Sequence, residues 1–425
     1  DAELLLLSKE SINIAKDFTI NTSYSNHKII TDQDFIIGGD FNAKDTLYLN
    51  TGGNTQVGNN MNVFGSIIKE AKDEFGLAFT VKNTATIYDN GRISVSGKAI
   101  EHQKNTTLGC FTSISQYTTG DCVIGAYFNA LTNGVSGYNS GNASGHGGGV
   151  IQVAAGKIVH DGELLANSSY YGGNFYQSAS GGSIRLKSTT SISGSGVISA
   201  NPAVNEYYYK QGNSGRIALL SDDVSNANFD IKSVPISRYQ SDQGEAGTVF
   251  VADKNGKNGI LTIDNTRSNW NTSYRNRIKT PIRGAGKHQI DCVTNLGNNL
   301  WRLDTDCSAD NNIEHWNDSN IDKKRSLIGR MIDPDIYNPL DHAVEIVSND
   351  KNSLVVRTPQ DLSNYAGATL QGIHLLKGLK VINSANIPTY VFYYADWCPY
   401  CHKMAPNVKK AAQEYTAKTP NKPRF

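Results

Sequence analysis

Short segments in which apolar and polar residues alternate recur along this chain of 425 residues. Each of the clearest segments begins with glycine and then carries an apolar side chain at every second position, which predicts a β-strand with one buried face. Their starts are 33, 33 and 32 residues apart, at residues 149–153, 182–186, 215–219 and 247–251. A second short element recurs with them, at residues 87–96, 158–167 and 192–201. The pattern therefore predicts a chain built from a β-strand repeat.

The repeat favours a mainly β fold in which parallel coils stack as a right-handed β-helix, also called a β-solenoid. Helical spacing is almost absent, and glycines mark the corners. Alternate residues should point inward and stack in ladders, as in the pairs Ile151/Val153, Ile184/Leu186 and Ile217/Leu219. A propeller is the structural competitor, but its blades usually need four strands in about 40–50 residues.

The chain divides into three predicted parts. Residues 1–255 form the Gly- and Asn-rich β-helix, whose repeat is clearest at 149–251 and less regular over 1–75. Over residues 256–386 the repeat fades while alternation persists, which we interpret as further β-rich coils or a cap. Residues 387–425 differ in kind and predict a short α/β segment.

Residues 181–201 carry the pattern Gly-Gly-x-Ile-x-Leu followed by Ile-x-Gly-x-Gly-x-Ile-x-Ala-Asn. This pattern resembles the Gly-rich β-helix repeats of large secreted surface proteins and adhesins. The resemblance implies a structural scaffold or filament whose partners are other copies, surface proteins or glycans. A carbohydrate-binding or carbohydrate-cleaving β-helix protein is one alternative, since loop tyrosines at 170–171 and 207–209 could stack on sugar rings. Coil stacking would decide which carboxylates meet, so no catalytic pair can be chosen from the sequence.

One motif in this chain indicates a specific chemical reaction, and it lies near the C-terminus. Residues 389–394 are rich in aromatic and β-branched side chains and predict a buried strand. Apolar residues between Met404 and Tyr415 then recur at helical spacing. Cys398 would lie at the N-terminus of this helix, where unpaired N–H groups and the helix dipole favour a thiolate. We therefore predict that Cys398 attacks a substrate disulfide and that Cys401 resolves the mixed disulfide.

This stretch resembles the first half of a thioredoxin-like domain. Besides the strand, the resemblance rests on Trp397, Cys398, Pro399, Tyr400, Cys401 and Pro406. The last of these stands where thioredoxins carry a helix-kinking proline, whereas the Pro-Tyr pair between the cysteines is the glutaredoxin choice. The resemblance implies a thiol–disulfide oxidoreductase that acts on disulfide-containing proteins. Zinc is the competing interpretation of one CxxC motif, but no second CxxC or histidine pair is close enough in sequence to supply further ligands.

The remaining strands of a thioredoxin fold, with their cis-proline loop, do not appear before Phe425. We therefore expect this chain to be a fragment of a longer protein, and the sequence leaves open whether it is an enzyme. A solenoid that merely targets an oxidoreductase is accordingly the second functional alternative to a scaffold.

Composition and the other cysteines indicate the compartment. The net charge of +1 gives no electrostatic footprint for nucleic acid or an anionic membrane, and no apolar run reaches the ~18 residues of a membrane span. Forty glycines and 21 tyrosines suit a turn-rich extracellular, cell-surface or periplasmic protein. The pairs Cys110/Cys122 and Cys292/Cys307 bracket short loops, which predicts sequence-local disulfides in an oxidising compartment. Four buried free thiols are the alternative.

No cofactor is expected, although one acidic segment leaves calcium open. Asp304, Asp306 and Asp310 alternate as in a calcium loop, but Ala309 replaces the expected glycine and His315 stands where an EF-hand places glutamate. Asp333 and Asp335 form a second, equally weak candidate pair. His146, within a Gly-rich stretch, is interpreted as a corner-loop residue.

Overall fold

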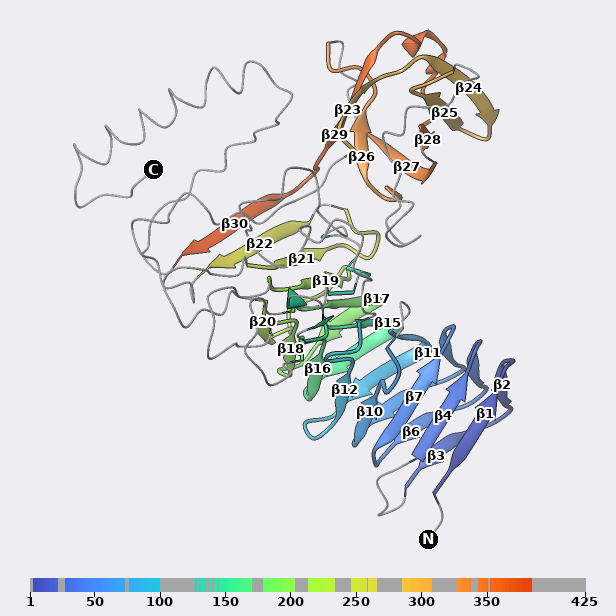
Figure 1. Ribbon diagram of the computed structural model, residues 1–425, viewed down its shortest axis with the longest axis vertical. Helices are drawn as coiled ribbons and strands as arrows, with labels where there is room; N and C mark the ends of the chain where they lie inside the picture. The colour runs from blue at the N-terminus through green and yellow to red at the C-terminus, as the bar shows by residue number, and fades with distance from the viewer. Residues whose placement is uncertain are drawn as a thin grey trace, which may run out of the picture.

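A computed structural model gives the architecture of much of the chain (Figure 1). The described residues are 3–21, 27–72, 76–99, 127, 130–131, 133–134, 138–139, 142–143, 145–169, 179–202, 213–233, 246–257, 259–265, 285–307, 327–337, 343–350 and 352–383. These residues are mainly β, and their helical content is a single turn of 3-10 helix at Ser363–Tyr365.

Eight of the described strands form a parallel sheet that extends from the blue strands at the lower right of Figure 1 to the green strands left of its centre. In spatial order they are β1 (Leu5–Ser8), β4 (His27–Thr31), β7 (Leu47–Thr51), β10 (Ser66–Ile68), β12 (Arg92–Ser94), β16 (Glu163–Leu165), β18 (Val197–Ser199) and β20 (Asp230–Lys232).

A second sheet, called the long sheet from here on, contains 13 of the described strands. Its main path is β2 (Ile12–Ile14), β5 (Phe35–Ile37), β8 (Thr55–Val57), β11 (Leu77–Ile87), β15 (Val150–His160), β17 (Ser183–Ser193), β19 (Arg216–Leu220), β21 (Thr248–Ala252), β22 (Ile260–Asn265) and β30 (Gly378–Asn383). Three further strands join it through β11: β3 (Phe18–Ile20), β6 (Phe41–Ala43) and β9 (Met61–Val63). All pairs in this sheet are parallel except β21 with β22.

The predicted inward ladders are confirmed. Ile184 pairs with Ile151 on one side and with Ile217 on the other, and all three side chains are fully buried. Leu186 pairs in the same way with Val153 and Leu219. One continuous core cluster contains these residues together with inward side chains of the eight-stranded sheet, so the apolar core lies between the two parallel sheets.

The N-terminal part repeats with a shorter period than the 32–33 residues of the clearest repeats. Equivalent positions are 23 residues apart where Asn42 bonds Thr19, 20 apart where Asn62 bonds Asn42, and 24 apart where Asn83 bonds Asn59. Glycines let successive units stack closely: a Cβ on Gly58 would clash with the carbonyl oxygen of Gly38 in the preceding unit. Each unit here contributes one strand to the first sheet and two to the second.

Residues 285–373 contain a separate antiparallel sheet, drawn in brown and orange in Figure 1. In spatial order its seven described strands are β23 (Lys287–Gln289), β29 (Thr369–Ile373), β26 (Met331–Asp333), β27 (Val344–Asn349), β28 (Ser353–Arg357), β25 (Leu300–Asp304) and β24 (Cys292–Gly297). It has its own core, which includes Trp301, Leu303, Ile332 and Val356. A small antiparallel pair, β13 (Tyr138–Asn139) with β14 (Asn142–Ala143), completes the described strands.

Candidate functional site

The described chain approaches the predicted dithiol through strand β30. This strand runs parallel to β22, with Leu379 opposite Leu261 and Val381 opposite Ile263. The antiparallel sheet of residues 285–373 lies between these two strands in sequence, yet both strands belong to the long sheet (Figure 1). The chain therefore leaves the long sheet after β22, forms the antiparallel sheet, and rejoins the long sheet beside β22.

Apolar packing as well as backbone pairing holds this return strand. Ala218 of β19 and Phe250 of β21 occupy positions between the inward residues of their strands. Together with Leu261 they belong to a further buried cluster, separate from the core between the parallel sheets. Tyr127 covers the cluster, with its ring edge-on to Phe250 at 4.9 Å between centroids. Leu379 packs against the same cluster. The first residues after Gly378 are thus fixed on the long sheet by side chains and by hydrogen bonds.

The predicted dithiol residues lie beyond this strand. Cys398 follows Asn383, the last residue of β30, by 15 positions. The residues Trp397, Cys398, Pro399, Tyr400, Cys401 and Pro406 fall outside the described residues, and so do Cys110 and Cys122. Their predicted roles therefore stay predictions.

Cys292 and Cys307 form a disulfide with their Cα atoms 6.2 Å apart. Cys292 begins β24, and Cys307 lies just beyond the end of β25, so the bond closes the open end of this hairpin. The other end turns through Asn298 and Asn299, which both have positive φ angles, as the turn of a tight hairpin requires. A covalent bond and a tight turn thus fix the two ends of the same pair of strands.

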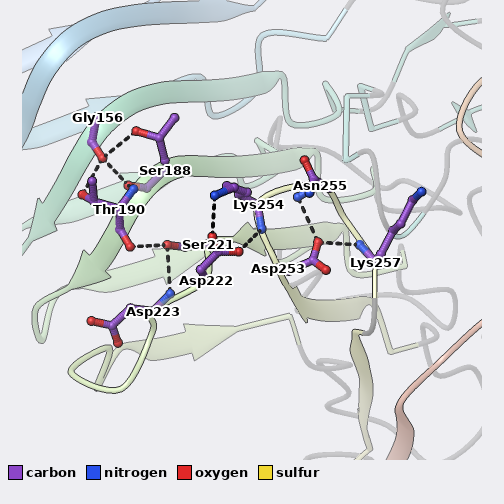
Figure 2. Close-up of polar contacts among 11 residues, drawn as sticks. Gly156, Ser188, Thr190, Ser221, Asp222, Asp223, Asp253, Lys254, Asn255 and Lys257 are labelled. Carbon is purple, nitrogen blue, oxygen red and sulfur yellow. Dashed lines mark hydrogen bonds and ion pairs between the residues drawn. The ribbon is translucent and has the colours of Figure 1, made fainter.

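The turns that follow β19 and β21 carry a polar network that was not predicted from the sequence (Figure 2). Nζ of Lys254 lies 2.7 Å from Oδ2 of Asp222, and its backbone N–H donates to Oδ1 of the same carboxylate. The hydrogen bond from the lysine side chain lowers the pKa of Asp222, and the same bond raises the pKa of Lys254. Asp253 accepts hydrogen bonds from the backbone N–H groups of Asn255 and Lys257. These carboxylates therefore hold turns and neighbouring repeats together.

Beside this network, hydroxyl groups join one repeat to the next (Figure 2). Ser188 and Thr190 both donate to the carbonyl oxygen of Gly156, at 2.7 Å. Ser221 donates in turn to the carbonyl oxygen of Thr190. The signal for this network was present in the sequence as Ser and Thr residues within β17 and as Ser and Asp residues directly after β19 and β21.

The acidic residues considered for calcium take part in local hydrogen bonds. Asp304 accepts from Nε of Arg302 at 2.8 Å, and Asp333 accepts from the backbone N–H of Asp335 at 3.1 Å. Asp310 and His315 fall outside the described residues. Within the described part of the chain, no group of three or more His, Cys, Asp or Glu side chains could hold a metal ion.

His146, predicted to be a corner-loop residue, lies beside Lys72 and Ser169. Nε2 of His146 lies 2.7 Å from Nζ of Lys72, and its backbone exchanges hydrogen bonds with Ser169 in a neighbouring loop. Among the described helical residues, none forms a helix long and apolar enough to cross a membrane.

The pairing of β22 with β30 was not predicted from the sequence. A signal was available, because Gly259 and Gly378 each precede a segment of alternating apolar residues, as in the repeats. The long intervening sheet hid this relationship, since the fixed interval of the repeat no longer applied.

Comparison with protein families gives one match. The thioredoxin family model matches residues 379–421, about a tenth of the chain, and the matched segment contains both Cys398 and Cys401. Its first residues, 379–383, belong to β30. The β-rich repeats are not covered by this match. Comparisons with curated proteins and with solved structures gave no match.

Proposed function

We propose that this protein is an extracellular or cell-surface β-solenoid scaffold that carries a thioredoxin-like dithiol. The observation that carries the proposal is the thioredoxin match at residues 379–421, whose first residues form the last strand of a long, mainly parallel sheet. A redox segment would then be joined to the scaffold through a packed strand.

The solenoid part of the proposal rests on how the chain moves between the two parallel sheets. From β1 to β20, apart from the small β13–β14 pair, the chain visits the eight-stranded sheet and the long sheet in alternation. Each new strand of these sheets pairs in parallel with the equivalent strand of the unit before. A single core lies between the sheets. Parallel connections of this kind are almost always right-handed, which favours a right-handed β-helix.

Deletion of whole and partial repeats tests the solenoid. Ser183 pairs with Arg216, so removing residues 183–215 places each later strand one full unit back and keeps inward residues inward. We expect this variant to keep its β-sheet circular dichroism and to unfold cooperatively. Removing residues 183–199 instead should disrupt the register, because it takes out only part of a unit. Equal behaviour of the two deletions would contradict a stacked-coil architecture.

The location rests on the Cys292–Cys307 disulfide and on the composition. Structural disulfides persist in oxidising compartments and are rare in the cytosol. Abundant glycine, tyrosine and turn residues suit a surface protein, as the sequence indicated. Such a scaffold would contact other copies, surface proteins or glycans.

The dithiol would act by thiol–disulfide exchange. The Cys398 thiolate attacks one sulfur of a substrate disulfide, which forms a mixed disulfide and releases the other substrate sulfur as a thiolate. The Cys401 thiolate then attacks Sγ of Cys398 and releases the second substrate thiolate. The substrate disulfide gains two electrons, while Cys398 and Cys401 become a disulfide.

Trapping of the mixed disulfide tests this chemistry. With oxidised glutathione as the probe, the Cys401→Ala variant should retain one glutathione on Cys398, which intact mass and peptide mapping detect. The matched Cys398→Ala variant should retain none at this motif, because the attacking thiol is absent. Equal labelling of both variants, or of neither, would contradict the assigned roles.

A further inference from the structure

Part of the outward face of the long sheet carries positive charge without a matching carboxylate. On β17 the outward side chains include Arg185 and Lys187, because Ile184 and Leu186 point into the core. Strands β15 and β19 lie on either side of β17 near the centre of Figure 1. The positions directly across from the two cations hold neutral side chains, namely Gln152, Ala154, Ala218 and Leu220. No carboxylate therefore stands opposite either cation.

The guanidinium group of Arg185 has no partner of its own. Within the described part of the chain it forms neither a hydrogen bond nor an ion pair, and its Nε is buried without an acceptor. Burial lowers the pKa of Arg185, and no neighbouring carboxylate acts in the opposite direction. Because an unpaired, half-buried cation costs free energy, this position favours an anion that the chain does not itself supply.

A second arginine shows the contrast. Arg92 points outward from β12 of the eight-stranded sheet, and its Nε lies 2.6 Å from Oε2 of Glu163, directly across on β16. Cross-strand pairing thus provides a carboxylate for this guanidinium. Arg185 has Gln152 and Ala218 at the corresponding positions instead.

A carboxylate is the anion that fits the arrangement around Arg185. A planar guanidinium can donate two parallel N–H bonds to the two oxygens of a carboxylate. Lys187 adds a second positive charge on the same strand and face, and the side-chain amide of Gln152 can donate or accept a hydrogen bond. One strand further along the sheet, the hydroxyl-bearing Thr80 of β11 lies opposite Ala154. Cations and neutral hydrogen-bonding groups are therefore neighbours on this face.

Recognition on this face depends on side chains. The backbone of β17 pairs with β15 on one side and with β19 on the other, so a peptide cannot add to it as a further strand. A sugar acid needs no backbone pairing, because its carboxylate and hydroxyl groups meet charged and neutral polar side chains. The face thus favours an acidic glycan over an acidic peptide.

We propose that the outward face of β15 and β17 binds a carboxylate group of an acidic glycan, with Arg185 as its bidentate partner. Lys187 and Gln152 contact the same sugar unit or the one beside it. The inference specifies one class of partner for the proposed scaffold and rests on that role, but it does not depend on the dithiol.

Binding of a galacturonate trimer to the full chain, measured by isothermal titration calorimetry, tests this site. The methyl ester of the same trimer carries no negative charge and should bind at least ~10-fold more weakly. Arg185→Met keeps an apolar stem but removes the charge, and it should weaken binding of the trimer at least ~10-fold. Arg185→Lys keeps the charge without the planar fork, so it should also bind more weakly than the unmodified chain. Arg92→Met is the matched control and should leave the affinity unchanged, because that guanidinium already pairs with Glu163.

Equal affinity of Arg185→Met and the unmodified chain for the trimer would overturn the proposal, as would equal binding of the trimer and its ester. Tighter binding of triglutamate than of the trimer would identify an acidic peptide as the ligand and reject the glycan. Absence of binding with every probe would reject the site altogether. Such a failure is distinct from failure of the proposed scaffold, because the deletion of residues 183–215 tests the stacked coils without any ligand.

Discussion

The imidazole ring of His160 lies directly against Gly196 of the next repeat: a Cβ on Gly196 would be 2.8 Å from Cε1 and Nε2 of the ring. His160 ends β15 and is fully buried. Its Nε2 donates a hydrogen bond to the carbonyl oxygen of Val197 at 3.1 Å, and the ring of Phe229 lies 5.3 Å away. The histidine thus occupies the space that any side chain at position 196 would need.

Replacement of Gly196 by alanine should therefore destabilise the parallel sheets. The added methyl group would lie 2.6 Å from the carbonyl oxygen of Gly162 and 2.8 Å from the buried ring, so both the backbone and the ring would have to move. In a packed core such a rearrangement costs about 1–3 kcal/mol. Gly378→Ala is the matched control, because a Cβ there would meet only Ile260 at an ordinary 3.7 Å. Chemical denaturation of both variants measures the difference. Equal stability of the two variants would contradict close packing of Gly196 against Gly162 and His160.

The buried state of His160 should also make stability depend on pH. Burial lowers the pKa of His160 from 6.5 to about 4, although the hydrogen bond to Val197 and the charge of Asp161 act in the opposite direction. The unfolded chain therefore binds this proton more readily than the folded chain. The free energy of unfolding should fall as the pH drops from 6.5 towards 4, by up to roughly 3 kcal/mol.

Denaturation curves of the unmodified chain and of His160→Gln, recorded between pH 7.5 and 4, measure this contribution. Glutamine can still donate to Val197 but does not titrate in this range. We expect the variant to lose less stability on acidification. Parallel pH profiles for the two proteins would show that another group dominates the acid response.

Fixed intervals explain which parts of the fold could be predicted from the sequence. Glycine and apolar residues keep the same phase from Ile151 to Ile217, so both the strands and their inward faces were predictable. The N-terminal units were predicted as strands, but their shorter and uneven period was missed because their turns differ in length. Ile260 pairs with Gly378 across a whole intervening sheet, a relationship that no fixed interval encodes.

For the candidate dithiol, the chemistry could be predicted from the sequence, but its attachment to the rest of the fold could not. The spacing of Cys398 and Cys401, together with Trp397, predicted thiol–disulfide exchange, and the thioredoxin family match covers the same residues. Local spacing could not predict how this segment joins the rest of the chain. That junction depends on Leu379 packing with Leu261 and Phe250, which come from distant parts of the sequence.

Truncation in the middle of the inward ladder should be costly. Ile184 is fully buried between Ile151 and Ile217, so Ile184→Ala would leave a cavity in the core. The expected loss is about 2–5 kcal/mol of unfolding free energy. Lys187→Ala, on the same strand but without a buried side chain, should change stability far less. Denaturant titration of the pair measures the contrast, and similar losses in both would contradict a packed ladder.

Removal of the Cys292–Cys307 disulfide should weaken the antiparallel sheet selectively. The bond closes a loop of 15 residues, for which chain entropy predicts about 3 kcal/mol of stabilisation. Replacing both cysteines with alanine avoids reducing any other cysteine of the chain. Hydrogen exchange should then quicken in β24, β25 and β28, whose core is separate from that of the parallel sheets. Strands β15, β17 and β19 serve as the internal control, and faster exchange there as well would show that the two cores unfold as one unit.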